Sequence, residues 1–177
     1  MTGSAVPTAG APAVPATPVW DRFTITFADG GSLRLFDKRR LGRVRLDPDL
    51  DRLGPDAQQV SATDFAERVG RSAAPVKARL LDQSVVAGVG NLLADETLWQ
   101  ARISPRRPAN ELSGKELAGL HRALQRSTED AIRNGGVHTG QVIEFRAVGR
   151  QCLRCGTELV MATVGGRTTW WCPNEQR

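Results

Sequence analysis

The chain has 177 residues, enough for one sizeable hydrophobic core and a small additional module. Its net charge of +5 favours a polyanionic partner, and it contains no apolar run of the ~18 residues that a membrane span requires. The N-terminus also lacks the basic and apolar regions of a secretory signal. We therefore expect a cytoplasmic protein, a location that also suits three cysteines of which two form Cys-x-x-Cys.

The N-terminal part of the chain combines a low-complexity arm with a predicted β-hairpin. Residues 1–19 are rich in Ala, Pro, Gly, Ser and Thr, and we expect a disordered arm there. Apolar and polar residues alternate in Phe23–Phe27 and in Ser32–Phe36, on either side of Asp29-Gly30-Gly31, which indicates a hairpin. Arg43–Leu46 can add a third strand.

Helical patterns follow. Ser61 is predicted to cap a helix that runs to about Val69, with Phe65 and Val69 on its buried face. Pro75 suits the first turn of a short helix that continues through Leu81.

A capping box at Ser113-Gly114-Lys115-Glu116 predicts a long helix, which Gly135-Gly136 should end. We expect four apolar side chains near one stripe of this helix: Leu117, Leu120, Leu124 and Ile132.

A glycine turn, Gly88-Val89-Gly90, leads into a helix predicted from Asn91 to Arg102. Leu93 stands where a third glycine would be needed, so the turn is not a dinucleotide-binding fingerprint. Backbone N–H groups and the positive end of the helix dipole can hold a phosphate at such a helix start, and a plain helix cap is the alternative. Asp95 and Glu96 lie early in this helix, and we expect them to interact favourably with the helix dipole rather than to act as an acid–base pair.

The C-terminal segment contains a second predicted hairpin, with Leu159–Val164 and Arg167–Trp171 on either side of Gly165-Gly166. Arg167 follows the turn directly. A guanidinium presented there can clamp a phosphate with planar, bidentate geometry, and a surface arginine without a specific role is the alternative.

The same segment carries a possible metal site. Cys152 and Cys155 form Cys-x-x-Cys, and Cys172 follows the hairpin. A fourth cysteine would complete a common zinc site, but Glu175 stands near that position, and a carboxylate is a less usual ligand of structural zinc than a thiolate. Three interpretations are open: zinc on three thiolates with Glu175, water or another donor; a finger that Trp170, Trp171 and the hairpin hold with weak or no metal; and an incidental redox pair.

Two further basic positions are candidates for nucleic-acid contact. In Arg39-Arg40-Leu41-Gly42, the leucine beside two cations can insert between base steps, and a charged hairpin exit is the alternative. Lys77 can reach a phosphate, or it can be one of many exposed helical lysines without a specific contact.

These motifs together resemble one protein family. Residues 77–96, with their Leu-Asp-Gln and Gly-Val-Gly-Asn motifs, resemble the helix–two-turns–helix domain of the Fpg/Nei (MutM) DNA glycosylases. The segment with Cys-x-x-Cys-Gly, Gly-Arg-x-Thr and Cys-Pro is similar to the family's C-terminal zinc finger. Asp37–Gly42 is similar to the family's Asp-x-Arg-Arg-Phe-Gly loop, and Met1–Ser4 resembles its Met-Ser/Thr-Gly turn.

The resemblance implies an α+β fold with a remnant of the family's N-terminal β-sandwich. The implied parts are a disordered arm over 1–19, a remnant β-hairpin region of the catalytic domain over 20–55, a helix–two-turns–helix DNA-binding domain over 56–136, and a zinc-finger-like hairpin over 137–177.

The resemblance also implies roles for individual residues. Asn91 and Arg167 correspond to the phosphate clamps on the lesion strand, and Lys77 would support them. Met1, Arg39 and Leu41 correspond to the three residues that fill the space left by an extruded base, and Leu41 stands in place of the family's usual phenylalanine wedge. The predicted DNA-binding residues are Asn91, Arg167, Lys77, Arg39, Arg40, Leu41 and Met1.

For the finger, the resemblance implies one zinc ion. Cys152, Cys155 and Cys172 match the family's ligands, whereas Glu175 departs from the pattern as the fourth ligand.

Members of this family flip a damaged base, attack the sugar with the amine of an N-terminal proline, and use the next residue, a glutamate, for proton transfer. This sequence starts Met-Thr-Gly, and we expect that an upstream segment is missing because of a late start assignment or a truncated gene. The resemblance then implies a monomer, nucleoid-associated if bacterial, that takes part in base-excision repair. It would bind double-stranded DNA with a damaged base or an abasic site and show little or no excision.

Two alternatives remain. A longer chain would be an active DNA glycosylase and abasic-site lyase. A non-enzymatic interaction protein would instead use the finger to hold a protein partner.

Overall fold

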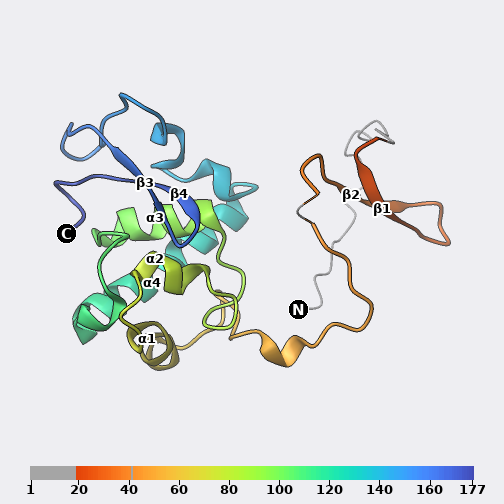
Figure 1. Cartoon of the computed structure of the whole chain (residues 1–177), viewed down its shortest axis with the longest axis horizontal. Helices are drawn as coiled ribbons and strands as arrows, with labels where there is room; N and C mark the ends of the chain where they lie inside the picture. The colour runs from red at the N-terminus through yellow and green to blue at the C-terminus, as the bar shows by residue number, and fades with distance from the viewer. Residues whose placement is uncertain (1–18, 41) are drawn as a thin grey trace. The chain divides into compact units, whose positions relative to one another are not determined.

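The computed structural model describes residues 19–40 and 42–177 of the chain (Figure 1). They belong to two compact units, residues 1–48 and residues 49–177. The arm predicted over residues 1–19, apart from Val19, lies outside the described residues. In the part of the chain that is described, no helix has both the length and the apolar character needed to cross a bilayer.

The first unit contains the predicted N-terminal hairpin. β1 (Asp21–Thr26) pairs with β2 (Ser32–Phe36) in antiparallel register, with Thr26 opposite Ser32. The turn closes with a hydrogen bond of 3.0 Å from the Gly30 N–H to the Phe27 carbonyl, and Gly30 has a φ of +84°. The hairpin is therefore confirmed.

The third strand predicted at Arg43–Leu46 is wrong, because this sheet has two strands within the described residues. The Asp37 carboxylate accepts the N–H groups of Arg39 (3.0 Å) and Gly42 (2.5 Å), which bends the chain into a turn after β2. Leu46 remains 99% exposed. The alternation of Arg and apolar residues therefore does not mark a strand here, and the segment is exposed.

The second unit is built around a helical core. Its helices are α1 (Ala62–Gly70), α2 (Val76–Leu81), α3 (Asn91–Ala101) and α4 (Gly114–Arg133). Ser61 caps α1 as predicted, since its Oγ accepts the Asp64 N–H at 3.1 Å. Pro75 stands at the N-cap of α2, one position before the first turn. The largest fully buried apolar side chains of the core include Phe65, Val69, Leu80, Leu98, Leu120 and Leu124.

Helix α4 starts at the predicted capping box and has its C-cap at Asn134, just before Gly135. Leu117, Leu120 and Leu124 are buried, but the prediction for Ile132 is wrong because this side chain is 61% exposed. A helix turns about 100° per residue, so a position eight residues after Leu124 lies well to the side of the apolar stripe.

Glu116 in this capping box should make the stability of the helical unit depend on pH. Hydrogen bonds from Ser113 and then Arg107 lower the pKa of Glu116 from 4.5 to about 2. A depressed carboxylate pKa stabilises the fold above the unfolded-state value, and this contribution is lost as the pH falls from 4.5 toward 2. Because the side chain is one-third exposed, we expect Glu116→Gln to cost about 1–2 kcal/mol at pH 7.

Urea unfolding at pH 7 and pH 3 measures this contribution. The difference in unfolding free energy between wild type and Glu116→Gln should shrink at the lower pH. Glu67→Gln is the control, because Glu67 is in an exposed pair with Arg71 and should contribute little at either pH. An equal wild-type advantage at both pH values would contradict the prediction.

The C-terminal part of this unit carries the second predicted hairpin, β3 (Val160–Val164) and β4 (Arg167–Trp171), which pair in antiparallel register. Its turn residues Gly165 and Gly166 have φ values of +59° and +71°, as the two-glycine turn predicts. The remaining elements are short 3-10 helices at Leu50–Arg52, Ala109–Glu111, Val137–Thr139 and Ile143–Phe145. Helices and two small antiparallel sheets together give the predicted α+β fold.

Candidate nucleic-acid interface and metal site

One side chain shapes the loop that leads into α3. The Gln83 amide donates to the carbonyls of Leu81 (3.1 Å) and Val89 (3.0 Å), and its oxygen accepts the Gly88 N–H at 2.9 Å. Gly88 adopts a φ of +92° in this loop. In the sequence Gln83 stands out only as part of the Leu-Asp-Gln motif, because its hydrogen-bond partners are backbone groups that the sequence does not mark.

The loop delivers Asn91 to the first turn of α3, as the glycine turn predicts. The N-cap is Gly90, which has no side chain to cap the helix, and the first turn contains no acidic residue. Both features leave the backbone N–H groups and the positive end of the helix dipole available to an anion.

The tip of the C-terminal hairpin approaches α2 closely. A Cβ atom on Gly165 would lie 3.0 Å from the Cα of Ala78 and 3.1 Å from its Cβ, so only glycine fits there without movement. Arg167 begins β4 just after this turn and is exposed. The Asn91 amide donates to the carbonyl of the next residue, Thr168, at 3.0 Å.

The structure thus brings Asn91 and Arg167 to one hollow of about 410 Å³. It lies between the loop before α3 and the hairpin turn, two segments far apart in the sequence. Its lining residues are Leu81, Gln83, Val89, Gly90, Asn91, Gly165 and Arg167.

Lys77 does not line this hollow, and the alternative that it is an exposed helical lysine is wrong, whereas its implied role of supporting Asn91 and Arg167 stays a prediction. Its side chain is fully buried, and its Nζ donates to Asp95 Oδ1 at 2.5 Å and to Thr169 Oγ1 at 2.7 Å. Burial lowers the pKa of Lys77, and the neighbouring Asp95 carboxylate opposes that shift. Lys77 therefore connects α2, α3 and β4 inside the protein.

The two acidic residues of α3 also differ from the prediction that they serve the helix dipole. Asp95 is 1% exposed and its Oδ2 accepts from Arg146 Nε at 2.8 Å. Glu96 is 6% exposed and accepts the Val142 N–H at 2.9 Å. Both carboxylates lie in the second turn and bind groups from the C-terminal segment, which sequence spacing does not reveal.

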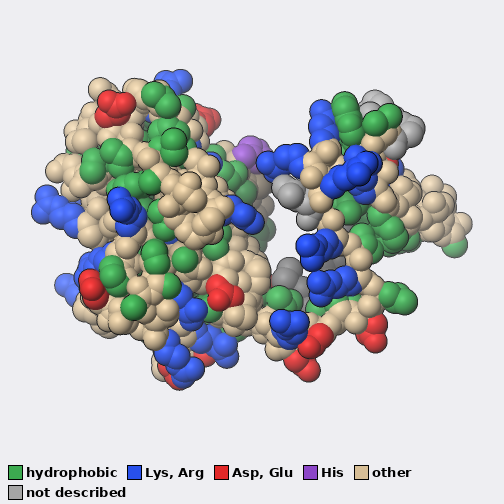
Figure 2. Space-filling model, viewed as in Figure 1, with side chains coloured by type: hydrophobic (Ala, Val, Ile, Leu, Met, Phe, Trp, Pro, Cys, Tyr) green, Lys and Arg blue, Asp and Glu red, His purple; other side chains and the backbone are tan. Residues whose placement is uncertain are grey.

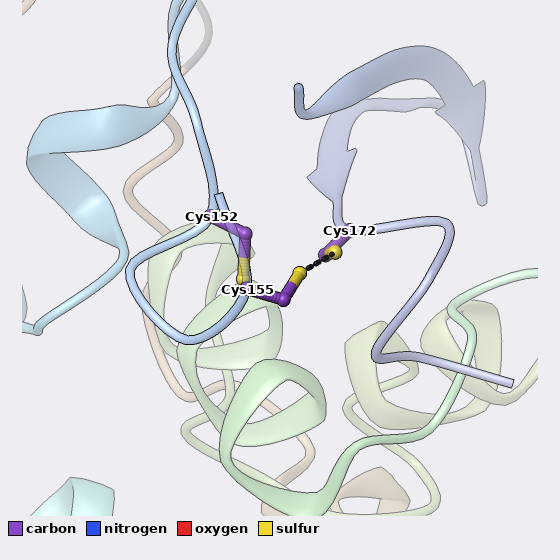
Figure 3. Close-up of side chains that lie close together, drawn as sticks. All are labelled: Cys152, Cys155 and Cys172. Atoms are coloured by element: carbon purple, nitrogen blue, oxygen red, sulfur yellow. Dashed lines mark hydrogen bonds between the residues drawn. The ribbon is translucent and has the colours of Figure 1, made fainter. Parts of the chain in front are cut away.

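The three cysteines converge on one point, as Figure 3 shows. All three Sγ atoms lie within 4.8 Å of one another, and those of Cys155 and Cys172 are 3.5 Å apart. Tetrahedral zinc with Zn–S bonds of ~2.3 Å needs sulfurs roughly 3.8 Å apart, so the donor set fits this ion. Hydrogen bonding with Thr157 lowers the pKa of Cys155 to about 6, whereas burial raises that of Cys172 to about 11.

Glu175 is not brought into this cluster of cysteines. Its Oε2 lies 3.0 Å from Arg102 Nη1, while its backbone N–H donates to Cys172 Sγ at 3.4 Å. Arg102 is the C-cap of α3, with a left-handed φ of +58°. The carboxylate therefore forms an ion pair with a mostly exposed arginine, and it is not part of the group that the three thiols form.

The remaining predicted residues belong to the first unit or lie outside the described residues. Arg39 and Arg40 are exposed in the turn after β2, whereas Leu41 and Met1 are not among the described residues. Figure 2 shows basic side chains beside apolar ones on this unit. A wide apolar hollow there is lined by Phe23, Ile25, Leu33, Leu35, Val44 and Pro48, with Arg34, Arg43 and Arg45.

The helical part of the second unit matches a known family. Residues 53–142 match the model of the formamidopyrimidine-DNA glycosylase H2TH domain. The formamidopyrimidine-DNA glycosylase of Streptococcus pneumoniae is 35% identical over 175 residues, which are 85% of this chain and 64% of that protein. The Nitratidesulfovibrio vulgaris enzyme is 38% identical over 187 residues, 92% of this chain and 51% of that protein.

Solved structures give the same result. MutM (Fpg) from Thermus thermophilus matches with a TM-score of 0.76 and 34% identity, covering 92% of this chain and 70% of that one. Lactococcus lactis Fpg, in a complex with abasic-site DNA, matches with a TM-score of 0.74 and 30% identity, covering 96% and 69%. The chain thus spans between about half and two thirds of the length of the curated relatives named here.

Proposed function

The chain belongs to the formamidopyrimidine-DNA glycosylase family, and from this premise we propose that its 177 residues bind double-stranded DNA with an abasic site or a damaged base. The observation that carries the proposal is the hollow where Asn91, Arg167 and the uncapped start of α3 meet. A helix N-terminus and a guanidinium that share one hollow suit two successive backbone phosphates.

The solved relatives support this choice of partner. Lactococcus lactis Fpg has been seen with DNA that contains an abasic site and with DNA that contains FAPY-dG. The net charge of +5 adds the long-range attraction that phosphate binding uses. We propose that the protein acts as a monomer in base-excision repair, at the nucleoid if its source is bacterial.

We further propose that this polypeptide by itself excises damaged bases little or not at all. The family resemblance assigns attack and proton transfer to a proline followed by glutamate, and this dipeptide does not occur in the 177 residues. A second candidate follows from the partial coverage of the relatives: a longer protein that contains this sequence would be an active glycosylase and abasic-site lyase.

The finger is proposed to hold one zinc ion through Cys152, Cys155 and Cys172. When bound, zinc would fix the thiols as thiolates and hold together the segments before and after the hairpin. Because the Glu175 carboxylate is held by Arg102, water is the proposed fourth ligand.

Fluorescence anisotropy with the 177-residue chain tests the binding proposal. A duplex with a tetrahydrofuran abasic site should bind at least about tenfold more tightly than an undamaged duplex, with affinity falling steeply as salt increases. Equal and salt-insensitive binding of both duplexes would overturn the proposal and favour a protein partner.

The excision proposal has its own assay. Incubation with an 8-oxoguanine duplex should release no base above background, and borohydride with a natural abasic duplex should trap no covalent adduct. Base release above background would overturn the proposal, and a trapped adduct would show that an amine of this chain acts as a nucleophile.

A further inference from the structure

We propose that Asp95 is a positioning residue that acts, together with Lys77 and Arg146, on the backbone beside Arg167. The inference rests on the proposed function, since it concerns how the phosphate-binding hairpin is held. Nothing in the sequence patterns assigned this task to Asp95 or Arg146.

Three donors from separate parts of the chain converge on one backbone oxygen, the carbonyl of Thr168. Asn91 Nδ2 lies 3.0 Å from this oxygen, Arg146 Nη2 lies 3.3 Å from it, and Lys77 Nζ lies 3.5 Å from it. These residues come from α3, from the loop after Ile143–Phe145, and from α2. The peptide group between Thr168 and Thr169, one residue after Arg167, is therefore held by three donors.

A single carboxylate orients two of these donors. Asp95 Oδ1 accepts from Lys77 Nζ at 2.5 Å, and Oδ2 accepts from Arg146 Nε at 2.8 Å. The Asp95 and Lys77 side chains are fully buried and that of Arg146 is 14% exposed. Removing one partner of a buried ion pair leaves the others with an uncompensated charge, so this group should lose its geometry as a unit.

Arg167 needs such an anchor. A two-stranded hairpin is only marginally stable by itself, and Arg167 lies in its first position after the turn. The hydrogen bond that its guanidinium makes in this structure goes to the adjacent Gly166 carbonyl at 3.4 Å. The place at which the hairpin presents this guanidinium therefore depends on the backbone, which the contacts to the Thr168 carbonyl hold.

Arg146 itself is assigned to positioning and not to phosphate contact. It would otherwise be counted among the DNA-binding cations near the hollow, but its Nε is bound to Asp95 and its Nη2 to the Thr168 carbonyl. Because Arg146 is bonded to protein groups whereas Arg167 is exposed, substitutions at the two positions should affect DNA binding differently.

A double-mutant cycle tests the inference with the full chain and the abasic duplex. Asp95→Asn and Arg146→Gln should each weaken binding by about tenfold, because each breaks a charged hydrogen bond. In an Arg167→Ala background, the same changes should cost less than about twofold more, because they act through Arg167. Losses that multiply in full would overturn the positioning role, as would unchanged affinity in both single variants.

Arg107→Gln is the matched control. Arg107 pairs with Glu116 at 2.5 Å, also with partial burial, but in the capping box of α4. It should cost stability without changing DNA affinity by more than about twofold. An affinity loss equal to that of Arg146→Gln would mean that general destabilisation explains the effect and would overturn the inference.

Hydrogen exchange gives a second readout that needs no DNA. In Arg146→Gln, amide exchange within Val160–Trp171 should be about tenfold faster, while exchange in Gly114–Arg133 stays unchanged. Equal acceleration in both segments, or none, would overturn the inference. A wild-type chain that fails to bind DNA would sink the proposed function and leave this test of the anchor intact. Should Asp95→Asn fail to fold, Arg146→Gln carries both measurements because its side chain reaches the surface.

Discussion

Arg167→Ala is expected to weaken binding of abasic duplex DNA by about 10- to 100-fold, because a charged hydrogen bond to a phosphate is lost. The slope of log affinity against log salt should become shallower by roughly 1. Arg167→Lys should fall between wild type and alanine, since an ammonium keeps the charge but not the bidentate geometry. Anisotropy titrations at several salt concentrations measure both quantities.

Arg122→Ala is the control for Arg167→Ala. It removes the same charge from an exposed position on α4, away from the hollow. It should change affinity by less than about threefold, as expected of a distant surface charge. Equal losses in the two variants would show that net charge, and not a clamp at the hairpin, holds the DNA.

Asn91→Ala complements this experiment from the other side of the hollow. It removes the amide that bonds the Thr168 carbonyl at 3.0 Å, and with it any contact that the side chain makes to DNA. The backbone N–H groups at the start of α3 remain, so the loss should be smaller than in Arg167→Ala.

Local signals in the sequence predicted the local structure well. The Ser61 cap, the Ser113 capping box and the two-glycine turn each depend on residues within a few positions, so their patterns carry the whole cause. The failures at Arg43–Leu46 and Ile132 have different origins. The alternation at Arg43–Leu46 was present, but the segment pairs with no strand among the described residues, and Val44 and Leu46 stay more than half exposed. Ile132 lies to the side of the apolar stripe of α4 and is exposed for that reason.

The candidate site divides in the same way. The glycine turn located the start of α3 at Asn91, and the family resemblance singled out Arg167. The buried contacts that connect α3 to the hairpin were not predictable from the sequence. Lys77 contacts Asp95, which is 18 residues away in the sequence, and Thr169, which is 92 residues away. Arg146 meets Asp95 across 51 residues. In the sequence, the residues of a buried ion pair cannot be told from exposed charged residues, because their partners are distant along the chain.

Removal of zinc is expected to reduce DNA affinity about as strongly as Arg167→Ala does. Cys152 and Cys172 belong to a small apolar cluster with Trp99, Val142 and Leu159, which is a modest core for the whole finger. Without metal, or in Cys172→Ser, the hairpin should lose its fixed position, and affinity for abasic duplex should fall by about 10- to 100-fold. Elemental analysis of the purified chain should find about one zinc per chain, and a chelator titration followed by anisotropy measures the coupling.

Variants at Glu175 separate its two possible roles. If Arg102 holds this carboxylate, Glu175→Ala should keep zinc affinity within about threefold, while Cys172→Ser should lower it by at least about 100-fold. Glu175→Cys should raise zinc affinity, because a fourth thiolate is a softer donor than water. A loss in Glu175→Ala as large as that in Cys172→Ser would make the carboxylate a ligand after all. Zinc far below one per chain would leave the apolar cluster around Trp99 to hold the finger together, and DNA binding should then resist chelators.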